Sequence, residues 1–99
     1  MGVDAFEARV EGPTLQEAFE AARERAAREF GTSPYAGTVY SKDSVELYSE
    51  PPRPCREASA RAHELMNLHH HDTTSPAGAL PLATDGPVPA WLLFGRVVV

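Results

Sequence analysis

The last nine residues, Trp91 to Val99, constrain the fold of this chain more than any other segment. They are rich in aromatic and β-branched residues, which predicts a strand, with a bulge expected at Gly95. A strand in a one-sided sheet needs only one apolar face, so the second face must be covered by residues 71 to 89 folding back or by a second subunit. The two faces carry Trp91, Leu93, Val97 and Val99 on one side and Leu92, Phe94 and Val98 on the other.

The N-terminal third predicts a strand followed by an amphipathic helix. Residues 3 to 11 alternate between apolar and polar side chains, which is the pattern of a half-buried strand. Thr14 and Glu17 have the spacing of a capping box. Apolar residues then recur every three or four positions up to Phe30, and Gly31 follows as a C-terminal cap.

The middle of the chain predicts a hairpin and then a second helix. Residues 38 to 41 and 44 to 48 are short strand-like segments, and Lys42-Asp43 can turn the chain between them. Residues 55 to 71 have an apolar stripe at helical spacing. Residues 71 to 89 are rich in Thr, Gly and Pro and predict a long loop with at most a short extended piece at 79 to 83.

This order, strand-helix-strand-strand-helix-strand, predicts a single α+β domain over residues 1–99. With right-handed crossovers it corresponds to a ferredoxin-like β-α-β-β-α-β sandwich, an antiparallel sheet with both helices on one face. In the usual strand order of that fold the last strand is an edge. An edge strand that is apolar on both faces is the reason to expect a homo-oligomer.

Composition excludes several classes of protein. Cys55 is the only cysteine, so no intramolecular disulfide can form. The net charge of −5, with both signs interleaved, gives no basic face for nucleic acid. The N-terminus is too charged for a signal peptide and no run is long enough for a membrane span. The expected compartment is the cytoplasm.

Four residues around the end of the second helix are candidate metal ligands: His63, His70, His71 and Asp72. Asn67 stands where the zinc-protease motif needs its second histidine, and His63 and His70 are too far apart along a helix to share an ion directly. Histidines at a helix C-terminus are also favoured by the helix dipole alone. His69 falls on the apolar stripe and is expected in the core.

Two further places could carry chemistry or binding. Cys55 begins the second helix, where the dipole lowers a thiol pKa, but it falls on the buried stripe and is expected to be a core or half-buried thiol. No catalytic residues and no cofactor motif can be identified. The predicted binding residues lie in the loop after the first helix and on the last strand: Tyr35, Gly37, Thr38, Lys42, Trp91 and Phe94.

Three segments carry a family likeness: residues 2 to 31, Tyr35-Ala36-Gly37-Thr38-Val39 with Lys42, and residues 76 to 81 with Leu93-Phe94-Gly95. Together they resemble a family of small uncharacterised proteins from bacteriophages and actinobacteria with a Gly-Tyr-x-Gly-Thr-Ile-x-x-Lys stretch. The chain departs from that pattern at Ser33-Pro34 and Tyr40-Ser41. The resemblance implies a phage or mobile-element origin, and hence a host cytoplasm, but no activity.

The sequence therefore favours a non-enzymatic protein-interaction or regulatory module. Its partner would be another protein or a second copy, bound through the last strand and the loops at 31 to 42 and 71 to 89. One alternative is a small-ligand or metal-binding protein that uses the histidine cluster. Another is a small enzyme with a cleft near Cys55 or Tyr35.

Overall fold

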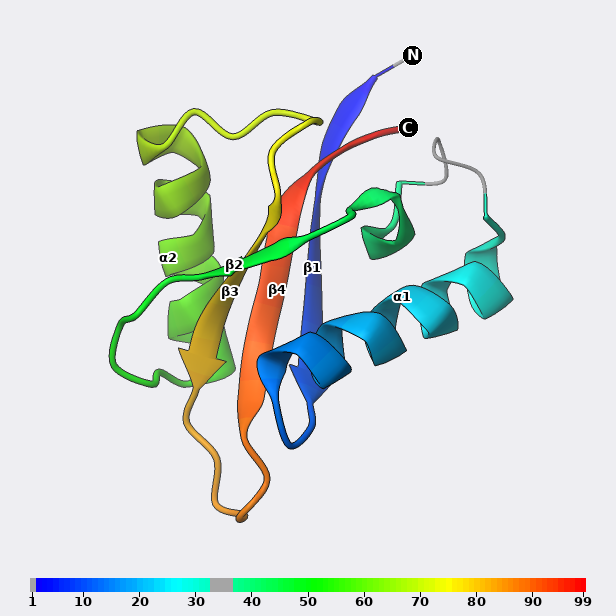
Figure 1. Cartoon of the computed structure of the whole chain (residues 1–99). Helices are drawn as coiled ribbons and strands as arrows, with labels where there is room; N and C mark the ends of the chain where they lie inside the picture. Colours follow the sequence, from blue (N-terminus) through cyan, green and yellow to red (C-terminus); the bar gives the residue numbers. More distant parts are fainter. Residues whose placement is uncertain (1, 33–36) are drawn as a thin grey trace.

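The computed structural model describes residues 2–32 and 37–99 of the chain, which form one four-stranded sheet and two α-helices (Figure 1). None of the helices in these ranges is long and apolar enough to cross a membrane. The elements in chain order are β1 (Val3–Glu11), α1 (Leu15–Phe30), the 3₁₀ helix η1 (Val39–Ser41), β2 (Val45–Leu47), α2 (Cys55–Leu68), β3 (Ala77–Leu82) and β4 (Ala90–Val98).

The strands lie in the order β1-β4-β3-β2. β4 pairs antiparallel with both β1 and β3, whereas β2 pairs parallel with β3. The α+β class is confirmed. The antiparallel ferredoxin-like sheet is wrong, because the sheet is mixed and β4 is an interior strand rather than an edge.

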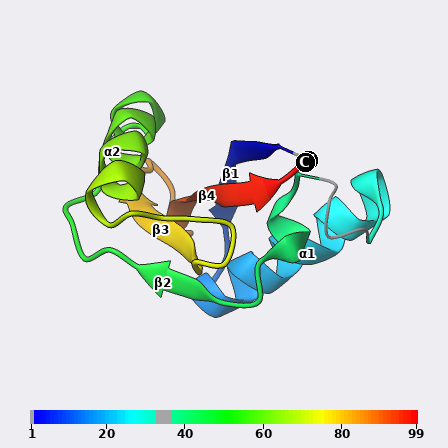
Figure 2. The same ribbon diagram turned by 90° about the horizontal axis from the view of Figure 1, so that it is seen from above.

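The helices cover opposite faces of the sheet, which corrects the prediction that both lie on one face (Figure 2). Because side chains alternate along β4, Leu92 and Phe94 pack in one cluster with α2, while Leu93 and Val97 pack in another with α1. The structure thus explains why the last strand is apolar on both sides. Its own two helices cover it, so this strand needs no second subunit.

α1 forms as its sequence predicts. The Thr14 hydroxyl accepts a hydrogen bond from the Glu17 amide, and the Gly31 amide donates to the Ala27 carbonyl, with Gly31 at a φ of 88°. Phe19 is fully buried on the sheet side, whereas Phe30 is 64% exposed. Most of the buried helix face is alanine, which matters for the site described below.

The predicted hairpin is wrong. Residues 39 to 41 form η1, capped by the Thr38 hydroxyl, which accepts from the Tyr40 amide. β2 then pairs with β3 and not with the preceding segment. The chain does not turn back at residue 42, where the Lys42 side chain is buried.

The loop predicted over 71 to 89 is wrong in its middle, because residues 77–82 form the interior strand β3, which overlaps the extended piece expected at 79 to 83. The segment has no β-branched residue, but small residues are needed here, since a Cβ on Gly78 would lie 2.3 Å from the Phe94 ring. The Ala77 amide and the Ala79 carbonyl form their hydrogen bonds on the β2 side of β3. The missing N–H of Pro81 faces the same side, at a point beyond the end of β2, so proline is tolerated there.

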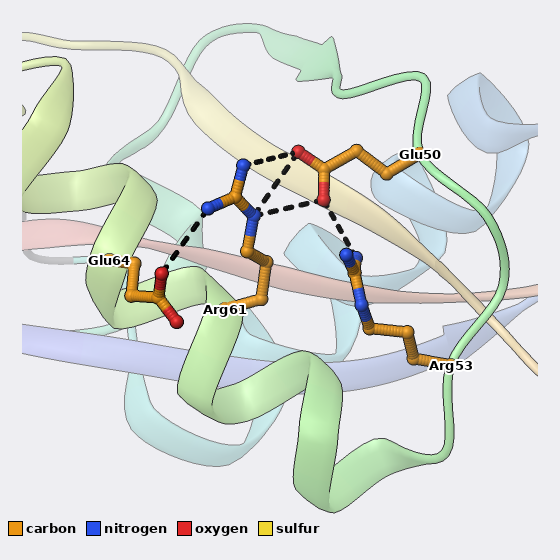
Figure 3. Close-up of polar contacts among 4 residues, drawn as sticks. All are labelled: Glu50, Arg53, Arg61 and Glu64. Carbon is orange, nitrogen blue, oxygen red and sulfur yellow. Dashed lines mark hydrogen bonds and ion pairs between the residues drawn. The ribbon is translucent and has the colours of Figure 1, made fainter.

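A group of ion pairs fixes the connection between β2 and α2 (Figure 3). The Glu50 carboxylate accepts hydrogen bonds from Arg53 at 2.7 Å and from Arg61 at 2.9 Å. Arg61 also reaches Glu64 at 3.3 Å. Bonds from Arg61 and Arg53 lower the pKa of Glu50 to about 2. Glu50 is therefore ionised wherever the protein is folded near neutral pH.

Candidate functional site: the groove between β1 and α1

A groove of about 530 Å³ lies between edge strand β1 and helix α1. Its walls are β1 from Phe6 to Glu11 and α1 from Ala18 to Phe30, and residues 37–39 close one end. Phe6 is buried at its floor, while Ala8 and Val10 are only half-buried. Apolar side chains of this strand are therefore still open to a further contact.

The groove exists because the helix face above it is made of small side chains. Ala18, Ala21, Ala22 and Ala26 all line it. A methyl group is too small to fill the space between a helix and the sheet beneath it, a space that larger side chains occupy in most packed layers. The helical spacing predicts that Ala18, Ala22 and Ala26 lie on the core face, and the structure shows that these small side chains leave part of the sheet uncovered.

The backbone of β1 is open along the same edge. Gly2 and Val99 exchange both of their backbone hydrogen bonds, and the Gly12 amide donates to the Pro89 carbonyl. Since bonded pairs alternate along an antiparallel ladder, the even residues of β1 bond β4 and the odd residues point their N–H and C=O groups outward. The Ala5 amide fits this pattern, because it bonds the Asp4 carboxylate.

α1 also extends beyond the edge of the sheet. Both views show its C-terminal half running past β1, on the side where the described part of the chain places no further strand (Figures 1 and 2). η1 lies in the same layer, held to α1 by the Arg23 guanidinium, which donates to the Tyr40 carbonyl at 3.1 Å. Helix and η1 together form a shelf beneath the position that a fifth strand would occupy.

The charges along β1 alternate in sign. Glu7, Arg9 and Glu11 are exposed on the face of β1 that looks away from α1. Arg9 and Glu11 are 3.6 Å apart in an exposed ion pair. Arg25 and Glu29 line the groove on the helix side. The edge therefore has an apolar side, a polar side and, between them, backbone groups that point away from β4.

Two of the six predicted binding residues line this groove, Gly37 and Thr38. Gly37 has a φ of 73°, and a Cβ there would lie 2.7 Å from the Val99 side chain, so this position requires glycine. Trp91 is half-buried and packs with the α1-side cluster, while Phe94 is fully buried on the α2 side. Tyr35 lies outside the described residues.

Lys42, which directly follows η1, is a structural anchor. Only 2% of it is exposed, and its Nζ donates to the carbonyls of Ser75 at 2.8 Å, Thr73 at 3.4 Å and Asp72 at 3.5 Å. Burial lowers the pKa of Lys42, and the charge of Asp72 partly opposes that effect. These bonds hold the turn before β3.

The candidate metal ligands point in different directions. His71 is buried and its Nε2 lies 2.9 Å from the Tyr48 hydroxyl, whereas His63 and His70 are exposed. Asp72 accepts hydrogen bonds from Thr74 and Ser75 within its own turn, which lowers its pKa. In the described parts of the chain no three His, Cys, Asp or Glu residues are placed to share an ion. The metal site stays a prediction.

Two expectations about burial are wrong. His69, expected in the core, is exposed at the end of α2, and its neighbour His71 is buried instead because the chain leaves the helix at His70 with a φ of 52°. Cys55 is exposed in the first turn of α2. It does not line the groove, and the enzymatic alternative gains no support from its position.

The sequence did not identify the residues of β1 and of the alanine-rich face of α1 as a candidate binding site. The signal was present in the alternation of Glu7, Arg9 and Glu11 and in the four groove alanines. Edge position, however, depends on strand order, which the sequence did not reveal. Comparison with protein-family models, with curated proteins and with solved structures found no match to this chain.

Proposed function

We propose that this chain is a non-enzymatic protein-interaction module that binds a polypeptide segment of a partner in the groove between β1 and α1. One observation carries the proposal: within residues 2–32 and 37–99, a strand edge without a paired strand and an apolar groove coincide at the same place. Free backbone groups alone are common at sheet edges, and apolar grooves alone are common between layers. Together they offer main-chain hydrogen bonds and side-chain pockets to the same ligand.

The surface differs from the one expected from the sequence. The last strand cannot serve as a docking surface, because Leu92, Leu93 and Phe94 are buried under the two helices. β1 takes that role because one of its long edges is open and because α1 covers its apolar face only in part. The class of function is unchanged, but the contact surface moves to the first strand.

Selection from a library of random twelve-residue peptides tests this proposal. The immobilised bait is the full chain, and the blocking variant is Ala21→Arg, which places a long charged side chain at an exposed position in the groove. The matched control is Ala60→Arg, an exposed alanine on α2. Both substitutions keep good helix formers at solvent-exposed sites, so both variants should fold.

We expect peptides that bind the wild-type chain and the Ala60→Arg control but lose at least tenfold in affinity for Ala21→Arg. Chemical-shift changes in the wild-type chain should centre on β1 and α1. A selection that yields no binder, or binders equally tight to all three proteins, would contradict the proposed function.

A further inference from the structure

Building on the proposed function, we infer that the bound segment adds to the sheet as a fifth strand, antiparallel to β1. We further infer that it carries basic, acidic and basic residues opposite Glu11, Arg9 and Glu7, with apolar residues between them. The partner is thus an extended segment with a period-two pattern. Its apolar side faces α1 and its charged side faces away from α1.

The backbone of β1 determines which residues of the new strand form hydrogen-bonded pairs with it. Glu7 and Arg9 point both their N–H and C=O groups away from β4, as do Val3, Ala5 and Glu11. In an antiparallel ladder these residues must form the bonded pairs with the new strand. The residues opposite Ala8 and Val10 form the non-bonded pairs, in which side chains approach most closely.

The two faces of β1 determine the side chains that the new strand must carry. Residues opposite Phe6, Ala8 and Val10 point towards the α1 side and enter the alanine-lined groove, where apolar side chains fill the space that the alanines leave. Residues opposite Glu7, Arg9 and Glu11 point to the open face. Directly opposite charges attract across a strand pair, and like charges repel.

The alternation of charge makes the edge selective. An edge with charges of one sign would repel every similar strand and would serve as protection against aggregation. Glu7, Arg9 and Glu11 instead match one charge order and oppose its inverse. The arrangement favours Lys or Arg, then Asp or Glu, then Lys or Arg in the incoming segment.

The shelf argues for a lone segment and against a second copy of this chain. Two copies joined antiparallel through their β1 edges would have both α1 helices and both η1 turns on the same face of one continuous sheet. Each shelf extends past its own β1, so the two shelves would compete for the same layer (Figures 1 and 2). A single extended segment lies above the shelf without bringing its own.

The first experiment measures charge order. The matched peptide is acetyl-Thr-Lys-Val-Glu-Val-Lys-Val-Thr-amide, and the inverse peptide exchanges every Lys and Glu. The proteins are wild type and the triple variant Glu7→Arg, Arg9→Glu, Glu11→Arg. The triple variant changes the net charge from −5 to only −3, so both proteins are acidic and a general charge attraction favours the same peptide with each.

We expect the matched peptide to bind wild type about tenfold more tightly than the inverse peptide, and the order to reverse for the triple variant. Equal affinity of both peptides for both proteins overturns the charge assignment. The same preference for one peptide in both proteins overturns it too.

The second experiment tests strand addition itself by N-methylating one peptide bond at a time. Methylation at the Glu opposite Arg9 removes an N–H that bonds β1 and should abolish binding. Methylation at the Val opposite Ala8 removes an N–H that points away and should change affinity less than threefold. The Glu7 and Arg9 amides should exchange hydrogen at least tenfold more slowly in the complex.

These outcomes separate the inference from the proposed function. If library peptides occupy the groove but their affinity shows no alternating sensitivity to N-methylation, strand addition is overturned and the proposed function still stands. Sensitivity at the Val instead of the Glu indicates a parallel strand and overturns the antiparallel assignment. A dimer of the chain that protects the Glu7 and Arg9 amides without peptide overturns the lone segment in favour of a second copy.

Discussion

The Tyr48 hydroxyl lies 2.9 Å from Nε2 of His71, and this contact joins the residue after β2 to the turn after α2. Both rings pack against Phe94, with ring centroids 5.8 and 6.0 Å from it. His71 is 7% exposed, and its buried Nδ1 has no hydrogen-bond partner among the described residues. The imidazole is thus held inside the protein with one polar contact.

The first prediction concerns the pH dependence of stability. Burial is the largest cause that lowers the pKa of His71, followed by the charges of His69 and Lys42. As the pH falls, His71 binds a proton near pH 6.5 in the unfolded chain but only at a lower pH in the folded chain. The free energy of unfolding is therefore greatest above pH 6.5. It should fall as the pH drops towards the lowered pKa, by roughly 1.4 kcal/mol for each unit of difference.

Urea unfolding at pH 7.5, 6.5 and 5.5 measures this effect. His71→Phe should flatten the pH dependence in this window, whereas His63→Ala, at an exposed position, should keep it. The same slope in wild type and His71→Phe would show that another group is responsible.

The second prediction concerns the Lys42 anchor. Lys42→Met keeps the apolar stem but removes the donors to three carbonyls, so the free energy of unfolding should fall by about 1–3 kcal/mol. Hydrogen exchange of residues 72–77 should become faster. Arg28→Met on the exposed face of α1 is the control and should change stability by less than about 0.5 kcal/mol.

The third prediction concerns Glu50. Its folded pKa of about 2 lies below the ordinary value of 4.5, so its ionisation stabilises the fold above pH 4.5, and this contribution is lost as the pH falls towards 2. About a fifth of the side chain is exposed, which screens the pairs. Glu50→Gln should therefore cost about 1–2 kcal/mol at pH 7 and much less at pH 2.5.

Glu64→Gln is the matched control, because the Glu64 side chain is 68% exposed and has a single arginine partner. We expect a change below about 0.5 kcal/mol. Urea unfolding of both variants at pH 7 and pH 2.5 provides the comparison, and an equal cost for the two substitutions would contradict the role given to Glu50.

The fourth prediction tests the orientation of the β1 backbone. Ala8→Pro removes a ladder bond to β4 and should destabilise the chain by about 1–3 kcal/mol. Ala5→Pro removes an N–H that points away from β4 and should cost less than half as much. Both changes start from alanine in the same strand. Similar costs in thermal or urea unfolding would mean that the assigned alternation is wrong.

The fifth prediction concerns the contact between β3 and Phe94. Gly78→Ala places a methyl group against the Phe94 ring in a fully packed interior, and should cost about 1–3 kcal/mol. Gly86→Ala is the control, because a Cβ there meets nothing within 4 Å. Differential scanning calorimetry should show a lower Tm for Gly78→Ala alone.

Short-range sequence patterns predicted the elements that depend mainly on neighbouring residues. The capping box at Thr14 and the three- and four-residue spacing after it gave α1, and the alternation at residues 3 to 11 gave β1. The hairpin failed because η1 and the buried Lys42 depend on contacts with α1 and with the turn at 72–75. β3 was predicted only as a short extended piece at 79 to 83, because its glycine and alanines suit a neighbouring aromatic ring and not an intrinsic strand preference.

The candidate site divides in the same way. The alternating charges of β1 and the alanines of α1 are properties of the sequence, but their meaning depends on β1 being an edge. That position follows from β4 inserting between β1 and β3, a long-range pairing that no local pattern specifies.

The sequence by itself determined that the last strand is buried on both faces, since Trp91 to Val98 carry apolar side chains on each side. Only the tertiary structure decided what covers them: α1 and α2 on opposite faces, with Tyr48 and His71 from the connecting segments packed against Phe94. The physical reason is that burial requires an apolar contact but does not specify which one. The choice depends on strand order and on which helix face can approach each side of the sheet.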